Sequence, residues 1–329
     1  MSIRQTLRNL TLCTSAAFVL APAMAFAQGA AAFPGKPVRL VVAYAPGGPT
    51  DVVTRVVGAF LQKKWNQPFV VENRPGANTQ IATTAVVQSP ADGHTLLMTS
   101  DTVASIQVVD PNWPYKEAKD LTPVGLLAGT GYTIIVTNSI PVKTMKELVD
   151  FIKANLGKVN EAMGGTVHLP MLDLERRLGL KDITAVIYKG NPEATNAVIS
   201  GEAHYYAPGS PVTVIKLAEA GKLKIVAYTD RERHRMMPNV PTVAESGVGL
   251  PDFSSTVWFA LMGPAGVPQD IVAKLNGGIQ EALKDPEVAQ KIESFGLRPM
   301  VANVAETQQQ IAKTLKTIEE LAASGVKIR

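Results

Sequence analysis

The stretch AYAPGGPTDVVTRVV (43–57) separates two segments whose hydrophobic residues follow different spacings. Before it, residues 38–42 form a short β-branched run, which is typical of a strand buried on both faces. After the turn, apolar residues recur at helical spacing, at positions 53, 56, 57, 60 and 61. The stretch therefore predicts a strand, a glycine turn and a helix, with Thr50 or Asp51 as the helix N-cap.

The glycine turn has two interpretations. Gly47 and Gly48 lack a Cβ, so a ligand can approach their backbone, and the start of the following helix offers free N–H groups with partial positive charge. Many strand-to-helix turns, however, contain glycine only because the chain reverses there. The sequence lacks the third glycine of a dinucleotide fingerprint and the Gly-Lys-Ser/Thr ending of a P-loop, so we expect no nucleotide at this turn.

Residues 1–27 have the pattern of a secretory signal peptide. Arg4 and Arg8 precede an apolar segment too short to span a bilayer, and small residues at Ala25 and Ala27 favour cleavage before Gln28. A buried N-terminal helix fits less well because amphipathic spacing is missing. Cleavage would remove the single cysteine of the chain, so we expect a soluble periplasmic protein held together by its core alone.

The charge balance argues against nucleic acid as a partner. The chain has 32 Lys and Arg against 28 Asp and Glu, a net charge of +4, and loss of the signal peptide would bring this value closer to zero. Basic blocks and interleaved basic and aromatic residues are missing. After the signal peptide, the sequence contains no apolar segment long enough to span a membrane.

The patterns of common catalytic and metal sites are also missing from the sequence. There is no Gly-x-Ser-x-Gly elbow, and the histidines at positions 94, 168, 204 and 234 do not form a metal-binding pair. We therefore expect a protein that is not an enzyme, with no catalytic residue, metal or cofactor. The histidines are expected to be surface or structural residues, although His168 and His204 flank turns that we assign to a cleft.

The remaining chain alternates short apolar runs with helical patterns, which predicts an α/β fold with mostly parallel sheets. Further strands are predicted at residues 69–72, 95–99, 133–137, 183–187, 203–207, 223–229 and 258–262. Helices are predicted at residues 144–154, 169–178, 192–199, 212–220, 268–283 and 305–322. Ligands in such folds bind where strands end and lead into helices.

Several predicted strand ends share one chemistry. Glycine, proline, serine and threonine dominate the turns NRPGAN (73–78), TSDT (99–102), MGGT (163–166), YKGN (188–191) and YAPGSP (206–211). Each turn alone is ordinary. Together they predict a ligand cleft that is lined by backbone amides and hydroxyl groups.

With these turns in place, the chain resembles the substrate-binding proteins of the tripartite tricarboxylate transporter family, also called Bug-type receptors. The resemblance extends over nearly the whole mature chain. It rests on FPGKPVRLVV (33–42), APGGPTD (45–51), VVENRPGA (70–77), ADGHTLL (91–97), IYKGNPEA (187–194), VPTVAESG (240–247), WFALMGPAGVP (258–268) and LNGGIQEALKDPEV (275–288).

The resemblance implies a type II periplasmic binding-protein fold, in which two α/β domains close on a ligand. Domain 1 would combine residues 33–132 with 244–329, and domain 2 would be 133–243. The ligand would be a small organic carboxylate: a di- or tricarboxylate, an amino acid or an aromatic acid. A monomeric receptor would deliver this ligand to the large and small permease subunits, or present it to a membrane sensor kinase. A periplasmic hydrolase is a more remote alternative.

From the turns and the resemblance together we expect a ligand site formed by fourteen residues. They are Tyr44, Pro46, Gly47, Gly48, Thr50, Asp51, Thr79, Ser100, Asp101, Thr166, His168, Lys189, Ala207 and Pro208. The sequence departs from the family pattern at Asn78, Thr79 and Ala82, at Gly164 to His168, and at His204 to Tyr206. These departures leave the ligand open, and Tyr205 and Tyr206 are either ligand contacts or core residues.

Overall fold

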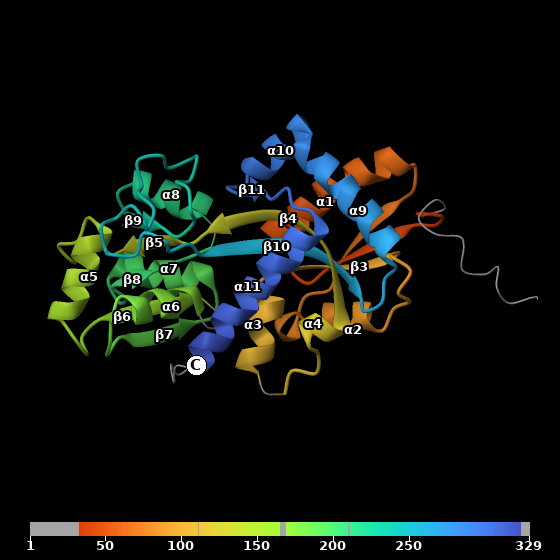
Figure 1. Cartoon of the computed structure of the whole chain (residues 1–329). Helices are drawn as coiled ribbons and strands as arrows, with labels where there is room; N and C mark the ends of the chain where they lie inside the picture. Colours follow the sequence, from red (N-terminus) through yellow and green to blue (C-terminus); the bar gives the residue numbers. More distant parts are fainter. Residues whose placement is uncertain (1–32, 111, 165–168, 210, 324–329) are drawn as a thin grey trace, which may run out of the picture.

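The computed structural model describes residues 33–110, 112–164, 169–209 and 211–323. Within these residues the chain forms two lobes, each built on its own β-sheet (Figure 1). The strand order is β11-β4-β10-β3-β1-β2 in the sheet of lobe 1 and β7-β6-β8-β5-β9 in the sheet of lobe 2. The predicted two-domain α/β fold is confirmed.

Lobe 1 is formed by the two ends of the described chain. Its strands are β1 (Val38–Val42), β2 (Phe69–Asn73), β3 (Thr95–Ser100), β4 (Leu121–Gly131), β10 (Thr256–Pro264) and β11 (Arg298–Pro299). Its helices are α1 (Pro49–Trp65), the 3-10 turn η1 (Ala77–Thr79), α2 (Gln80–Val87), α3 (Thr102–Val109), α4 (Glu117–Asp120), α9 (Gln269–Lys284), α10 (Pro286–Glu293) and α11 (Val304–Ala323).

Lobe 2 is formed by the middle of the chain. Its strands are β5 (Thr133–Val136), β6 (Asn160–Gly164), β7 (Thr184–Tyr188), β8 (Tyr205–Tyr206) and β9 (Lys224–Tyr228). Its helices are α5 (Met145–Ala154), α6 (Leu169–Arg177), α7 (Asn191–Ser200) and α8 (Pro211–Glu219). Val248, Leu250 and Phe253, which a domain boundary at residue 244 assigns to domain 1, pack against the core of lobe 2.

The first strand, turn and helix form as the sequence predicts, but the expected N-cap is wrong. Helix α1 begins at Pro49, and Gly48 is its N-cap, with an extended backbone and no side-chain capping bond. The fixed φ of proline suits the first helical position, which needs no N–H donor. Thr50 and Asp51 therefore lie inside the first turn of α1 and do not precede it.

The sheets are mixed and not mostly parallel, which corrects the sequence-based expectation. β1 pairs in parallel with β2 and β3, whereas β10 pairs antiparallel with β3 and β4, and β5 pairs antiparallel with β8 and β9. The sequence pattern missed β4 because Pro123 and three glycines interrupt it. Pro123 is tolerated because the β4–β10 register shifts beside its partner Met262.

The hinge between the lobes is a closely packed junction of both crossover segments. Tyr132 is the single residue between β4 and β5, and its N–H donates to Thr229 Oγ1 at 2.7 Å. Thr229 Oγ1 in turn donates to the carbonyl of Ser255 at 2.8 Å, just before β10. Gly131 leaves no room for a side chain, because a Cβ there would lie 2.7 Å from the backbone nitrogen of Asp230.

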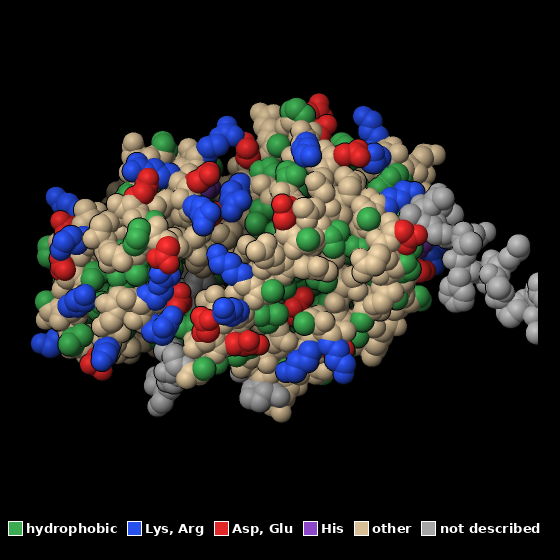
Figure 2. Space-filling view, viewed as in Figure 1, with side chains coloured by type: hydrophobic (Ala, Val, Ile, Leu, Met, Phe, Trp, Pro, Cys, Tyr) green, Lys and Arg blue, Asp and Glu red, His purple; other side chains and the backbone are tan. Residues whose placement is uncertain are grey.

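Helix α11 connects the two lobes on one face of the molecule (Figure 1). It packs against α3 and β4 of lobe 1, and its last turns reach α6 of lobe 2. Figure 2 shows that Lys and Arg side chains intermingle with Asp and Glu on this face, so neither sign dominates it. In the part of the chain that the structure describes, no helix is long and apolar enough to cross a membrane.

Two adjacent glycines in α9 differ in their surroundings. A Cβ on Gly277 would meet no atom within 4 Å, whereas a Cβ on Gly278 would lie 2.7 Å from the ring of Trp65 and 2.9 Å from Leu61. Gly278 therefore allows α9 to pack closely against α1. No packing contact requires a glycine at position 277.

We expect opposite effects from alanine at these two positions. Gly277→Ala should raise the free energy of unfolding by about 0.5–1 kcal/mol, because alanine loses less backbone entropy in a helix. Gly278→Ala should lower it by about 1–3 kcal/mol through overpacking against Trp65. Urea unfolding measures both, and equal effects at the two positions would contradict the packing of α9 on α1.

The core of lobe 2 contains two facing carboxyl groups. Burial raises the pKa of Glu175 to about 7, although hydrogen bonds from Tyr205 and Glu161 lower it. Burial, followed by the charge of Glu175, raises the pKa of Glu161 well above its ordinary value. Glu161 Oε1 is buried without a hydrogen-bond partner. Both groups bind protons more tightly in the folded protein than in the unfolded chain.

This pair predicts that the protein loses stability as the pH rises. Stability from the protonated pair is complete below the unfolded pKa of about 4.3 and is lost as the pH rises through about 7 and above. The melting temperature should therefore fall between about pH 5 and pH 8, and Glu161→Gln should flatten this slope by keeping a neutral donor. Glu219→Gln, an exposed change in the same lobe, should leave the slope unchanged. Equal slopes in both variants would exclude the pair as the cause.

Candidate functional site: the cleft between the lobes

A cleft of about 1160 Å³ lies between the lobes, where the strand-to-helix turns of both sheets meet. Residues at or near the N-termini of α1, α3, α7 and α8 line it. The first N–H groups of a helix lack internal partners and carry partial positive charge. The cleft therefore offers several fixed dipoles to a negatively charged ligand.

The glycine turn before α1 is held in shape by Asp51. The buried carboxylate accepts hydrogen bonds from the Gly47 N–H at 2.9 Å, from Arg55 Nε at 3.0 Å and from Asn73 Nδ2 at 2.9 Å. Burial alone would raise the pKa of Asp51, but the bonds from Arg55, Gly47 and Asn73 outweigh it and hold the pKa below its ordinary value. Asp51 thus fixes the turn and does not line the cleft.

Hydroxyl groups form the neighbouring wall of the cleft. Tyr44 OH and Ser100 Oγ lie 2.7 Å apart, and Ser100 Oγ lies 3.0 Å from Thr102 Oγ1. Asn73 Nδ2 also donates to the carbonyl of Tyr44 at 3.1 Å. These bonds connect the ends of β2 and β3 to the glycine turn after β1.

Asp101 adds a carboxyl group to this wall. It lies half-buried between Ser100 and the start of α3, and Tyr132 OH donates to its Oδ2 at 3.5 Å. Burial raises the pKa of Asp101 to about 7, despite the hydroxyl of Ser100 and nearby backbone N–H groups. The group therefore titrates near neutral pH.

Lobe 2 supplies amide and small side chains to the opposite wall. Asn191 Oδ1 accepts a hydrogen bond from Tyr206 OH at 2.6 Å, which fixes the start of α7. Gly164, at the end of β6, leaves room for this pair, because a Cβ there would collide with Tyr206 OH and Asn191 Oδ1. The wall is completed by Pro192, Thr195, Asn196, Pro208, Gly209 and Thr213.

Seven of the fourteen residues expected from the sequence line the cleft. They are Tyr44, Pro46, Gly48, Thr50, Ser100, Asp101 and Pro208. Thr166 and His168 lie outside the described residues. The other five lie elsewhere: Gly47 and Asp51 support the turn, Thr79 and Ala207 are buried, and Lys189 is exposed.

The sequence pattern missed lining residues at the hinge and inside the helices. Tyr132 occupies the crossover, and Thr195, Asn196, Thr213 and Leu217 lie further along α7 and α8. The turn motifs before α7 and α8 could have indicated these residues, because side chains one helical turn after the helix start face the same cleft. Tyr132 had no comparable signal.

The sequence did not decide whether Tyr205, Tyr206 and His204 contact the ligand, and the structure gives all three structural roles. Tyr205 is a core residue whose hydroxyl donates to Glu175, and buried Tyr206 supports Asn191 from behind the cleft wall. His204 Nδ1 accepts from the Asn160 N–H at 2.9 Å, which joins β6 to the loop before β8. Within the described residues, no group of His, Cys, Asp or Glu could hold a metal ion.

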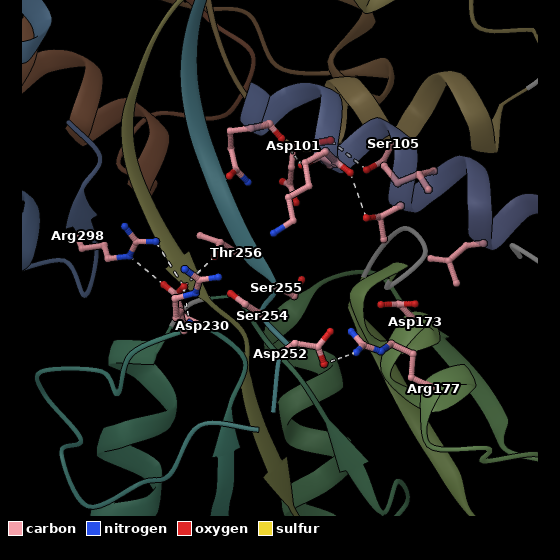
Figure 3. Close-up of a pocket in the computed structure, with 17 residues that line it drawn as sticks. Asp101, Ser105, Asp173, Arg177, Asp230, Asp252, Ser254, Ser255, Thr256 and Arg298 are labelled. Atoms are coloured by element: carbon pink, nitrogen blue, oxygen red, sulfur yellow. Dashed lines mark hydrogen bonds and ion pairs between the residues drawn. The ribbon is translucent and has the colours of Figure 1, made fainter. Parts of the chain in front are cut away.

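A second cavity of about 510 Å³ adjoins the cleft at Asp101 and Ser105. Figure 3 shows Asp101 and Ser105 above it and two ion pairs below. Arg298 Nε lies 2.9 Å from Asp230 Oδ2, and Arg177 Nη2 lies 2.7 Å from Asp252 Oδ1. The first pair joins β11 to the crossover segment. Asp101 therefore lies between this cavity and the cleft.

Two α/β lobes, joined by two crossover segments and separated by a cleft, are the architecture of a two-lobed binding protein. A model of the "Tripartite tricarboxylate transporter family receptor" matches residues 53–324, and the chain belongs to this family. Protein BugT of Bordetella pertussis is 32% identical over 305 residues, covering 91% of this chain and 92% of BugT. The family consists of periplasmic receptors and not of enzymes.

Solved structures agree with this assignment. A protein of R. palustris with adipate has a TM-score of 0.74 and 28% identity, covering 89% of this chain and 98% of its own. MatC from Rhodopseudomonas palustris, with bound malate, has a TM-score of 0.71 and 30% identity, covering 88% of this chain and 100% of its own. The periplasmic binding protein BugD has a TM-score of 0.68 and 28% identity, covering 89% and 97%.

Proposed function

We propose that this receptor captures a small organic carboxylate in the cleft between its lobes. The observation that carries the proposal is the convergence of the N-termini of α1, α3, α7 and α8 on a cleft without Lys, Arg or His among its described lining residues. Dipoles and hydroxyl groups can hold a carboxylate through charge-assisted bonds of about 1.5–3 kcal/mol each. The bound adipate and malate of two family structures support this class of ligand.

In this proposal the carboxylate binds at the glycine turn before α1. Gly48 lines the cleft, and its φ of −75° requires no glycine. A Cβ there would meet only Ala45 O, at 3.6 Å, so no packing within the protein demands its absence. The small size of Gly48 is explained if a ligand oxygen approaches this backbone. Ligand contacts by Pro46, Thr50, Ser100 and Pro208 belong to the same proposal.

We further propose export and delivery to a membrane partner. Residues 1–27 act as a cleaved signal peptide, and the mature receptor passes its ligand to the large and small permease subunits of a tripartite tricarboxylate transporter. Membership in the family supports a transporter partner. Presentation of the ligand to a sensor kinase is the alternative, and genes next to the coding region distinguish the two.

A screen of organic acids with the mature protein tests the proposal. A ligand that binds only the folded state raises stability by about 2.7 kcal/mol at a hundredfold excess over Kd, so thermal shift reveals it. Gly48→Val should then weaken binding of that acid at least about tenfold by calorimetry. Gly277→Ala, far from the cleft, should keep the wild-type affinity. Unchanged affinity in folded Gly48→Val would place the carboxylate elsewhere.

Closure of the lobes on one ligand predicts coupling between the two walls. Asn196→Ala in lobe 2 should weaken binding, and its combination with Gly48→Val in lobe 1 should be non-additive, because both act on one bound molecule. Small-angle scattering should show the wild type becoming more compact with ligand. Additive losses without compaction would indicate a rigid site on a single lobe.

A further inference from the structure

The cleft has an acidic side chain but no basic one among its described lining residues, which is unexpected for a receptor of anions. Among the described residues that line it there is one acidic side chain, Asp101, and no Lys, Arg or His. Among the ion pairs of the described residues none includes Asp101, and two of the four basic residues that line the adjoining cavity, Arg177 and Arg298, pair with Asp252 and Asp230. Asp101 therefore lines the cleft without an ion-pair partner among the described residues.

Asp101 also keeps hydrogen-bonding capacity. An ionised carboxylate offers about four acceptor positions. Tyr132 OH donates to Asp101 Oδ2 over a long distance of 3.5 Å, and the Ser100 hydroxyl and the N–H groups of Asp101 and Thr102 also lie near the carboxylate. Ser105 Oγ donates to the backbone carbonyl of Asp101 and not to its carboxylate. Because the side chain lines the cleft, a ligand donor can approach the acceptor positions that these contacts leave open.

Asp101 and the glycine turn favour ligand groups of opposite charge. Tyr44 OH contacts Ser100, the residue before Asp101, so the turn and the acid share one wall of the cleft. The helix N-terminus behind the turn favours a carboxylate. Asp101 repels a second carboxylate and attracts an ammonium group, and this effect is strong where water is excluded.

We propose that Asp101 selects ligands with a carboxylate at one end and an ammonium group at the other, in preference to dicarboxylates of the same length. This inference rests on the proposed function, because it assumes that a carboxylate occupies the glycine turn. It assigns Asp101 the role of a specificity residue that contacts the ligand. The pKa of Asp101, raised by burial to about 7, leaves the group mostly ionised at about pH 8.

Matched pairs of ligands test the inference. Succinate is compared with γ-aminobutyrate, and adipate with ε-aminocaproate, by calorimetry at about pH 8 on the mature protein. We expect at least one amino-carboxylate to bind about tenfold or more tightly than its dicarboxylate partner. In Asp101→Asn this preference should disappear, and the dicarboxylate should bind more tightly than it does to the wild type.

The variants separate this effect from changes in folding or total charge. Asparagine is as good as aspartate at a helix start, and it removes a carboxylate whose pKa is raised by burial, so Asp101→Asn should melt at or above the wild-type temperature at about pH 8. Asp150→Asn removes an exposed charge from α5 and should leave the preference unchanged. Equal or tighter binding of dicarboxylates by the wild type, or a preference that survives in Asp101→Asn, would overturn the inference while the proposed function stands. Binding of neither class, nor of any acid in the screen, would overturn the proposed function itself.

Discussion

The antiparallel pairing of β4 with β10 is the constraint on which the rest of the structure depends. These strands lie side by side in lobe 1, and both lead directly into the hinge. Gly131 ends β4 where a Cβ would collide with the backbone of Asp230, and its N–H donates to Tyr228 OH at 2.5 Å. Because both crossovers are fixed at one place, the turns of the two sheets face each other across one cleft.

The electrostatics of the cleft follow from this arrangement. Parallel strands end at one edge of each sheet, and each is followed by a helix that begins there. Because these two edges face each other, helix N-termini from both lobes come together at a cleft that has no basic side chain among its described lining residues. Asp51 stabilises this arrangement from behind, because it uses its charge to hold the Gly47 N–H and Asn73. Asp101 is the one acidic side chain among the described residues that line the cleft.

The sequence predicted what depends on local spacing and missed what depends on the assembled fold. The strand and helix around residues 43–57 were predicted because their hydrophobic periods change at the turn. The N-cap was wrong because α1 begins at Pro49 with Gly48 as its N-cap, two or three residues before the polar side chains of Thr50 and Asp51. Strand β4 was missed because Pro123 and its glycines have the composition of a loop, and only pairing with β10 makes them extended.

The same limit applies to the cleft. Tyr44, Gly48 and Ser100 belong to turns that the sequence marks, so their positions on the cleft wall were predictable. Tyr132 and Asn196 face the cleft only because the lobes are joined as they are. Asp51 has the residue type of a ligand contact, and its role as a support becomes clear only from its bonds to Gly47 and Arg55.

The position of β10 also determines when lobe 1 can be completed during synthesis. In its sheet, β10 lies between β3 and β4, and Gly131 is the direct partner of Thr256. The ribosome makes all of residues 132–255 before this central strand emerges, so β3 and β4 wait with unpaired edges while every strand of lobe 2 is already present. The second lobe of the receptor is therefore the first that can finish folding.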